Sequence, residues 1–176
     1  LDKYLFSKKS ISIPKPKGFV KLNRAETSFV RVKYPGDLLK LLEHPIKNKI
    51  LSPEDRFGLV RDAFMLAQSG QGSTSSALDL VKSFGKENEY IVWAQISSDL
   101  RTIDNLIFGQ PFYQSYRKFC REVFKPVTAK LGWTKKPNEP HTQTLLRSIV
   151  IYLLGSSGDK DIVEKIRKNI QHDKLM

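Results

Sequence analysis

The first part of the chain alternates apolar and polar residues at the two-residue period of β-strands. Residues 11–13 alternate isoleucine with serine, and Phe29–Tyr34 is rich in β-branched and aromatic residues. A proline-rich break at residues 14–18 and a polar turn at Asn23–Glu26 separate these runs. The pattern predicts two or three strands in the first 34 residues. So few strands are barely stable alone, so this part needs a partner sheet or the helices behind it.

From residue 37 onward, apolar residues recur every three or four positions, which is the period of amphipathic helices. Capping residues such as Asp37 and Ser52 precede two of the predicted helix starts. Pro45 is expected to end the first helix, and Pro126 to kink or split the fifth near Glu122. The expected helices are Leu38–Leu42, Pro53 to Gly70, one that is capped by the Ser73–Ser76 cluster and ends near Gly85, Glu87 to about Phe108, Phe112 to Leu131, Thr142 to Leu154 and Asp161 to Ile170.

Six or seven helices joined by short loops predict a mainly α fold. The expected architecture is an α-solenoid-like array of the HEAT/ARM kind, preceded by a short β-rich segment. No sequence repeat of fixed length supports a named repeat family. The predicted domains are residues 1–36 and 37–176. A start at Leu1 within a strand-like run and an ending without capping residues predict a piece of a larger protein, truncated at its C-terminus.

The composition of the 176 residues, 40% hydrophobic and 27% charged, is typical of a globular protein rather than a disordered one. No apolar run approaches the ~18 residues of a membrane helix. The formal net charge of +12 is compatible with a nucleic acid or an acidic membrane as partner. Prolines and hydrophobic residues interrupt the lysine-rich stretch, however, which favours solvated surfaces of strands. Nucleic-acid binding is therefore the weaker alternative.

Residues that could carry out chemistry are sparse. The three histidines, His44, His141 and His172, are isolated, and none has a second ligand at helical spacing. Cys120 is the single cysteine and lies beside Phe119, which predicts a small buried hydrophobic residue rather than a nucleophile. There is no phosphate-binding glycine loop and no nucleophile elbow. We therefore predict no catalytic and no metal-binding residue in this chain.

Six residues are candidates for a structural or cavity-wall role: Asp55, Arg56, Asp62, Glu87, Tyr90 and Trp93. The two aspartates lie on a helix whose other faces are apolar, and we expect them to hold Arg56 or a neighbouring loop. The functional alternative is a pocket wall that binds a peptide's carboxylate. Glu87 precedes a predicted helix, where an acid complements the helix dipole.

Four segments, in this order, resemble the M1-family zinc aminopeptidases of the puromycin-sensitive and aminopeptidase N type. They are Lys21–Asn23 with Phe29–Tyr34, Leu51–Arg56 with Leu59–Ala67, Glu87–Trp93, and Leu131–Trp133 with Leu145–Arg147 and Gly158–Asp159. Two departures occur: Ser28 replaces the family's usual glycine, and Phe19 stands where tryptophan is common. Both are packing changes, and the resemblance covers roughly residues 19–160.

This resemblance implies that the first 36 residues end a β-sandwich domain and that the rest begins the helical C-terminal domain. In that family the helical domain arches over the catalytic domain, encloses the peptide cavity and controls access. The zinc and the residues that activate water would lie upstream, so this chain would be inactive alone. Its partners would be the parent's catalytic domain and the peptide substrate. The sequence has no Asn-x-Ser/Thr site, which favours a cytoplasmic location. The alternative function is a stand-alone helical scaffold that binds other proteins.

Overall fold

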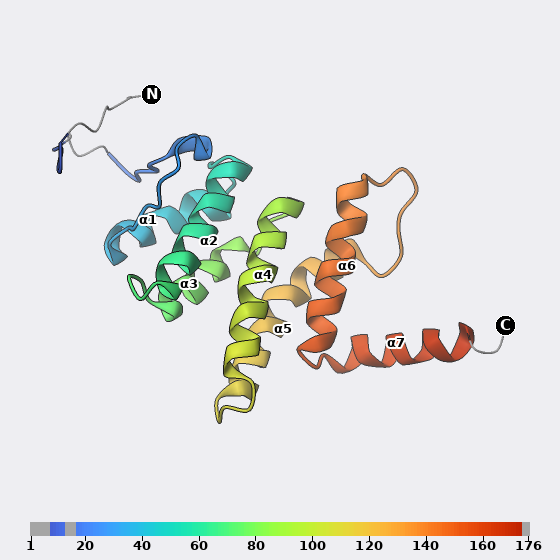
Figure 1. The fold of residues 1–176 in the computed structure, drawn as a ribbon. Coiled ribbons are helices and arrows are strands. Elements are labelled where there is room, and N and C mark those ends of the chain that lie inside the picture. Colours follow the sequence, from blue (N-terminus) through green and yellow to red (C-terminus); the bar gives the residue numbers. More distant parts are fainter. Residues whose placement is uncertain (1–7, 13–16, 174–176) are drawn as a thin grey trace.

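Helices make up almost all of the regular structure in the computed structural model, which describes residues 8–12 and 17–173 (Figure 1). The described residues form α1 (Gly36–Lys47), α2 (Pro53–Gln68), α3 (Thr74–Val81), α4 (Tyr90–Ile107), α5 (Tyr113–Leu131), α6 (His141–Ser156) and α7 (Lys160–Asp173). Two short 3-10 turns, η1 (Arg24–Glu26) and η2 (Lys82–Phe84), complete the list. The predicted mainly α fold is confirmed.

α4 occupies the middle of the molecule, with α2 packed on one side of it and α6 on the other (Figure 1). α3 packs against α2, and α5 lies behind α4 and α6. α7 extends away from the end of α6, which is the helix it contacts most. Three helices that alternate in the sequence, α2, α4 and α6, therefore lie side by side and form one face of the molecule.

The core is built where these helices meet. Trp93 of α4 packs on Phe124 of α5 with the ring centroids 5.7 Å apart, and both side chains are fully buried. The hydroxyl of Tyr116 donates a hydrogen bond to the carbonyl oxygen of Leu100 at 2.5 Å, so this polar group is satisfied inside the core. Full burial of each large apolar side chain contributes about 1.5–3 kcal/mol. The spacing of apolar residues thus places the core as the sequence predicts.

The predicted strands are absent from the described part of the N-terminal segment. Residues 8–12 and 17–34 contain no β-strand, and residue 13 of the first predicted strand lies outside the described residues. Phe29–Tyr34 has no regular secondary structure, and it contacts α2 instead of pairing with another strand. Its backbone finds a partner on a helix, because the Val32 N–H donates to Asp62 Oδ2 at 2.9 Å. A strand pattern alone does not specify which element satisfies the backbone.

Two prolines expected to interrupt helices lie inside them. Pro45 is in the last turn of α1, so the helix ends two residues after it, and its carbonyl oxygen accepts the Ile50 N–H at 2.9 Å. Pro126 lies within α5, which runs unbroken to its end and is not split near Glu122. Burial of Phe124 and of the residues that follow Pro126 holds both parts of α5 against the core.

The helix starts follow local capping with small shifts. Ser52 Oγ accepts the Asp55 N–H at 3.2 Å, which confirms the predicted cap of α2. α1 begins at Gly36, one residue before the expected cap Asp37. α4 begins at Tyr90 rather than at Glu87. The Glu87 carboxylate accepts the N–H groups of the next two residues, so Glu87 itself lies before the helix.

Candidate functional site

Two buried carboxylates of α2 fix the N-terminal segment across the start of that helix. Asp55 Oδ1 accepts the Ala25 N–H at 2.8 Å and lies 3.5 Å from Lys21 Nζ. Asp62, two turns further along α2, accepts the Val32 N–H. The two aspartates are 3% and 4% exposed, so these hydrogen bonds replace the water that each charge loses. The segment is therefore held at two points about seven residues apart in its own sequence.

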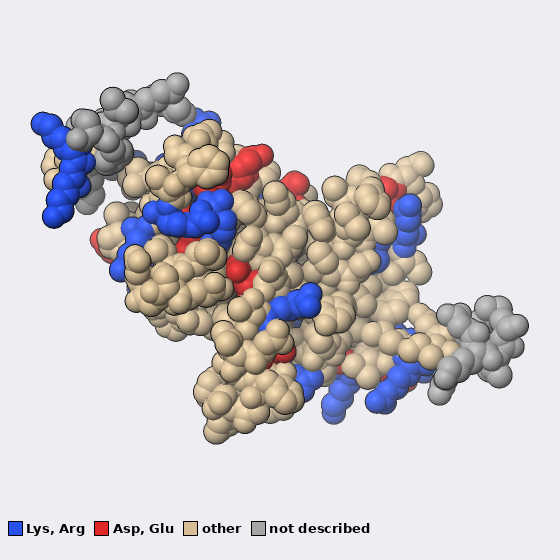
Figure 2. Space-filling view, viewed as in Figure 1, with Lys and Arg blue, Asp and Glu red and all other residues tan. Residues whose placement is uncertain are grey.

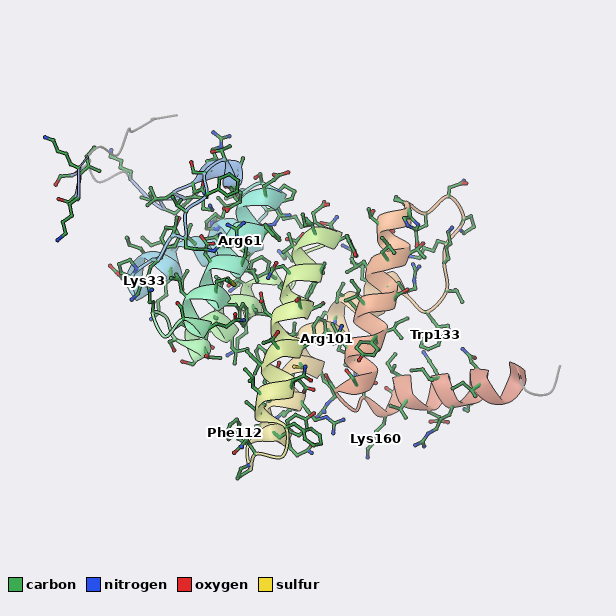
Figure 3. The ribbon with its side chains drawn as sticks, in the orientation of Figure 1. Lys33, Arg61, Arg101, Phe112, Trp133 and Lys160 are labelled. Atoms are coloured by element: carbon green, nitrogen blue, oxygen red, sulfur yellow. The ribbon has the colours of Figure 1, made fainter. Side chains whose placement is uncertain are left out.

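Glu26, in the η1 turn of the segment, and Arg61 of α2, which is labelled in Figure 3, take part in the same contact. Arg61 Nη2 forms an ion pair with Glu26 and also lies 3.1 Å from Asp62 Oδ1. Lys21 Nζ lies 3.1 Å from Glu26 Oε1. The Glu26 carboxylate lies against Gly58, where any Cβ would overlap it. Acidic and basic side chains accordingly gather where the segment meets α2 (Figure 2).

We call Lys21, Glu26, Asp55, Arg61 and Asp62 the α2 joint. The Tyr34 hydroxyl lies at its edge and accepts the Leu22 N–H at 2.8 Å. Burial, with the nearby carboxylates, raises the pKa of Tyr34 to about 12, so this phenol is neutral at physiological pH. Every charge of the joint faces an opposite charge or a backbone N–H, which is the arrangement of a rigid connection rather than of an open ligand pocket.

A second buried ion pair connects the starts of α2 and α4. Arg56 Nε donates to Glu87 Oε2 at 2.6 Å, and Arg56 Nη2 donates to Glu87 Oε1 at 3.0 Å. The remaining guanidinium nitrogen, Nη1, donates to the Leu51 carbonyl oxygen at 2.5 Å. Trp93 Nε1–H donates to the Glu87 carbonyl oxygen at 3.2 Å. Burial favours the neutral acid, but Arg56 and two backbone N–H groups hold the pKa of Glu87 below its ordinary value.

The structure divides the sequence-predicted candidates between these two clusters. The two α2 aspartates hold a neighbouring segment, which is one of the two arrangements expected for them. Arg56 is held by Glu87 instead of by an aspartate. Tyr90 is half-buried at the first residue of α4, and Trp93 lies in the core. Whether any of the six contributes to a cavity wall stays a prediction.

An open groove of about 790 Å³ lies between α4 and α6, a size within the range of ligand-binding clefts. It opens on the face formed by α2, α4 and α6, where Figure 3 places Arg101 between the two helices. The lining residues are Ala94, Ser97, Ser98, Arg101, Thr102, Asn105, Ser148, Ile149, Tyr152 and Leu153. The Arg101 guanidinium lies over the Tyr152 ring, 5.5 Å from its centroid. The groove therefore combines a small-residue floor with one cation and several hydroxyls.

Sequence reasoning overlooks this groove and a buried acid on the same helix. Asp99 is 5% exposed and accepts one hydrogen bond, from Gln95 Nε2 at 2.9 Å. Burial, opposed only by that hydrogen bond, raises the pKa of Asp99 to about 6. Polar residues on a helix resemble a solvated face in the sequence. The available signal was that no residue three or four positions from Asp99 is basic, since those positions hold Gln95, Ile96, Thr102 and Ile103.

Three further observations bear on chemistry. Within the described ranges, no three His, Cys, Asp or Glu side chains lie close enough together to hold a metal ion. Cys120 is buried, and its burial raises the pKa of the thiol to about 11. Among the helices described, none is both long and apolar enough to cross a membrane.

Comparison with known proteins identifies the family. Residues 19–174 match the family model of the ERAP1-like C-terminal domain. The chain belongs to this family. It is 33% identical over 153 residues to aminopeptidase M1-C of Oryza sativa subsp. japonica, which covers 85% of the chain and 17% of that protein. It is 32% identical over 173 residues to aminopeptidase 2 of Candida albicans, covering 94% and 19%.

A third relative is the puromycin-sensitive aminopeptidase of Caenorhabditis elegans, 28% identical over 152 residues, which cover 85% of the chain and 16% of that protein. The chain thus spans less than a fifth of the length of the curated relatives it matches. The assignment to the C-terminal region of an M1 aminopeptidase, made from the four sequence motifs, is confirmed.

Proposed function

We propose that this chain is the non-catalytic C-terminal part of a zinc-dependent M1 aminopeptidase and forms part of the wall of its peptide cavity. The observation that carries the proposal is the groove between α4 and α6, on the face where α2, α4 and α6 lie side by side. Alternation of helices between that face and the layer behind it is how α-solenoids build concave surfaces. The array would thus be HEAT/ARM-like, with its groove turned toward the substrate.

The chemistry of the parent would be the removal of N-terminal residues from peptides by a zinc-activated water. That zinc would be bound by other residues of the parent, and we derive no catalytic step from this chain. The chain's contribution would be to enclose the peptide and control its access. The cytoplasmic location and the domain boundary between residues 36 and 37 stay predictions. The family match begins at residue 19, and the α2 joint ties residues 21–32 to the helices.

The test uses the full-length parent and a substitution that fills the groove. Ser98 is exposed and lines the groove, so Ser98→Trp adds bulk there without entering the core. We expect kcat/KM for a peptide of about ten residues to fall several-fold, while turnover of a single aminoacyl-coumarin is unchanged. Ser115→Trp, at an exposed position of α5 outside the groove, is the matched control. If Ser98→Trp affected both substrates equally, or neither of them, the groove would not be part of the cavity wall.

The isolated chain provides a second test. We expect it to bind no zinc at one equivalent and to release no coumarin from aminoacyl substrates. Zinc-dependent turnover by the 176 residues alone would contradict the non-catalytic assignment.

A stand-alone scaffold that binds proteins is the second candidate function. It is favoured by an exposed apolar cluster at the turn between α4 and α5, where Leu106 and Phe108 are each 74% exposed and Phe112 is 55% exposed. An upstream reading frame without a His-Glu-x-x-His sequence would favour the scaffold over the aminopeptidase. Nucleic-acid binding is the weakest alternative. It predicts oligonucleotide affinity that falls steeply with salt.

A further inference from the structure

The turn that joins α4 to α5 presents large apolar side chains to the solvent. Leu106, Phe108 and Phe112 are all more than half exposed, and we call these three residues the α4–α5 tip. The turn forms the lower end of the molecule in Figure 1, and Figure 2 shows an uncharged projection there. Single apolar residues are common on protein surfaces, but three large ones gathered on one turn mark an interaction site.

The tip is a hydrogen-bonded turn. The Gln110 N–H donates to the Ile107 carbonyl oxygen at 3.0 Å, and the Tyr113 N–H donates to the Gln110 carbonyl oxygen at 2.9 Å. Gly109 supplies the positive φ of 80° at this turn. The Phe108 and Tyr113 rings meet edge to face with their centroids 5.4 Å apart. The apolar side chains are therefore presented outward by a backbone that has its own hydrogen bonds.

Basic residues outnumber acidic ones around the tip. Residues 101–130, from the last two turns of α4 through nearly all of α5, contain six basic and two acidic residues. The Arg117 guanidinium lies 5.7 Å from the centroid of the Tyr113 ring, and that ring contacts Phe108. The side chain of Lys118, which follows Arg117, is 71% exposed. The tip therefore lies beside a positively charged surface.

The start of α7 lies on the same side. Arg117 Nη2 donates to the Ser156 carbonyl oxygen at 3.0 Å, so the turn between α6 and α7 contacts this part of α5. Lys160, the first residue of α7, is exposed, and the exposed acid Asp161 follows it, so most of the excess positive charge comes from α5. Figure 3 places Phe112 and Lys160 on the lower side of the molecule, and Figure 2 shows further basic side chains along that edge.

We propose that this side of the chain binds the surface of an anionic lipid bilayer. The α4–α5 tip inserts at the boundary of headgroups and acyl chains, and the neighbouring cations contact the headgroups. A projecting apolar group with cations beside it is the combination that interfacial membrane binding uses. A protein partner is less favoured, because a specific protein interface uses about 20–30 residues a side and the tip offers three on a projecting turn. The proposal is independent of the proposed aminopeptidase function, because none of the three tip residues lines the groove.

Sedimentation with lipid vesicles tests the proposal on the 176-residue chain and on the full-length parent. One set of vesicles contains phosphatidylcholine alone, and in the other about a third of the lipid is phosphatidylserine. We expect both proteins to sediment with the anionic vesicles and to bind the neutral vesicles about tenfold more weakly. Raising the salt from about 0.05 to 0.5 M should weaken the binding without abolishing it, because salt screens the cations and not the apolar tip.

Substitutions assign the binding to the tip. The double variant Phe108→Ser with Phe112→Ser should bind the anionic vesicles about tenfold more weakly, since it removes most of the apolar area of the tip. Phe29→Ser is the matched control, because Phe29 is fully exposed but lies in the N-terminal segment, and it should bind like the wild type. Lys118→Gln should lower the affinity about fivefold. Lys40→Gln, at an exposed position of α1, should leave the affinity unchanged. The circular dichroism of every variant should match that of the wild type.

A fluorescent reporter measures insertion directly. In Phe108→Trp, the emission of the added tryptophan should shift to the blue when anionic vesicles are present, and brominated acyl chains should quench it. Phe29→Trp is the control and should show neither change. Both variants retain Trp93 and Trp133, so the signal is the difference from the wild type.

Three results would overturn the proposal. The first is no binding to either kind of vesicle, which is what a scaffold that binds only proteins predicts. The second is binding that the double serine variant retains, because adsorption would then rest on charge alone. The third is binding by the isolated chain and not by the parent, because the rest of the parent would then cover the tip.

Discussion

Replacing Arg56 by methionine removes the cation from the most enclosed ion pair among the residues that the structure describes. The Arg56 and Glu87 side chains are 4% and 1% exposed, and two hydrogen bonds of 2.6 and 3.0 Å join them. Methionine fills similar space but leaves a buried carboxylate without its counter-charge and the Leu51 carbonyl oxygen without its donor. Breaking a buried pair from one side costs about 3–5 kcal/mol. We therefore expect Arg56→Met to lose that much of its free energy of unfolding.

The assay is urea unfolding of the isolated chain, followed by circular dichroism and by tryptophan fluorescence. Lys82→Met is the matched control, because Lys82 pairs with Asp79 at 2.7 Å but the two side chains are 62% and 67% exposed. Exposed pairs contribute at most about 1 kcal/mol. The double variant Arg56→Met with Glu87→Gln should recover part of the loss, since it removes the orphaned charge. A cost for Arg56→Met no larger than that of Lys82→Met would refute the reasoning.

The pH dependence of the stability difference between wild type and Arg56→Met provides an independent test of this ion pair. In the wild type the pKa of Glu87 is lowered in the folded state, so its stabilisation is present above the unfolded pKa and is lost as the pH falls through the folded value. Without Arg56, burial is opposed only by the N–H groups of Asn88 and Glu89 and raises that pKa, so the variant gains stability as the pH falls. The difference between wild type and Arg56→Met should accordingly shrink between pH 7 and pH 4.5, and a difference that grows on acidification would contradict this.

Three further predictions concern single positions. Gly58→Ala should displace the Glu26 carboxylate, so amides at Ala25 and Val32 should exchange hydrogen faster with helix content unchanged; unaltered exchange would contradict the close approach. Asp99→Asn should raise the free energy of unfolding by about 1–2 kcal/mol at pH 7.5 and by nothing near pH 4. The reason is that the folded pKa of Asp99, about 6, lies above the unfolded value, so the wild type loses stability as the pH rises. A difference between variant and wild type that is the same at both pH values would refute this. Cys120 should react with a thiol reagent at pH 8 only in urea, and rapid labelling of the folded chain would contradict its burial.

The helices were predictable because their signals are local. Two helix starts are marked by the serines Ser52 and Ser73. In the structure, the side-chain oxygen of each accepts the N–H of the residue three positions later. Proline effects were less predictable, because Pro126 costs α5 a backbone hydrogen bond that packing elsewhere offsets. That packing joins residues far apart in the chain, which periodicity does not report.

The N-terminal segment shows why an alternating pattern misleads. Phe29–Tyr34 has the composition of a strand, but the structure gives it no regular secondary structure. A strand also needs a neighbour, and here Asp62 of α2 takes that place, 30 residues further along the chain. The sequence did single out Asp62 as an acid on a helix whose other faces are apolar. It did not indicate that the backbone of Val32 is the group that Asp62 binds.

The groove illustrates the opposite limit, because nothing in its sequence is unusual. Ala94, Ser97 and Ser98 are small residues on one side of α4, and small residues are as common on solvated helices as beside a cleft. They leave a groove only because α6 runs alongside in a register that sets Tyr152 opposite Arg101, 51 residues away in the chain. That register is determined by the core contacts of both helices and not by either segment alone. A cation stacked on a ring of the neighbouring helix is therefore a property of the packed array and not of either segment.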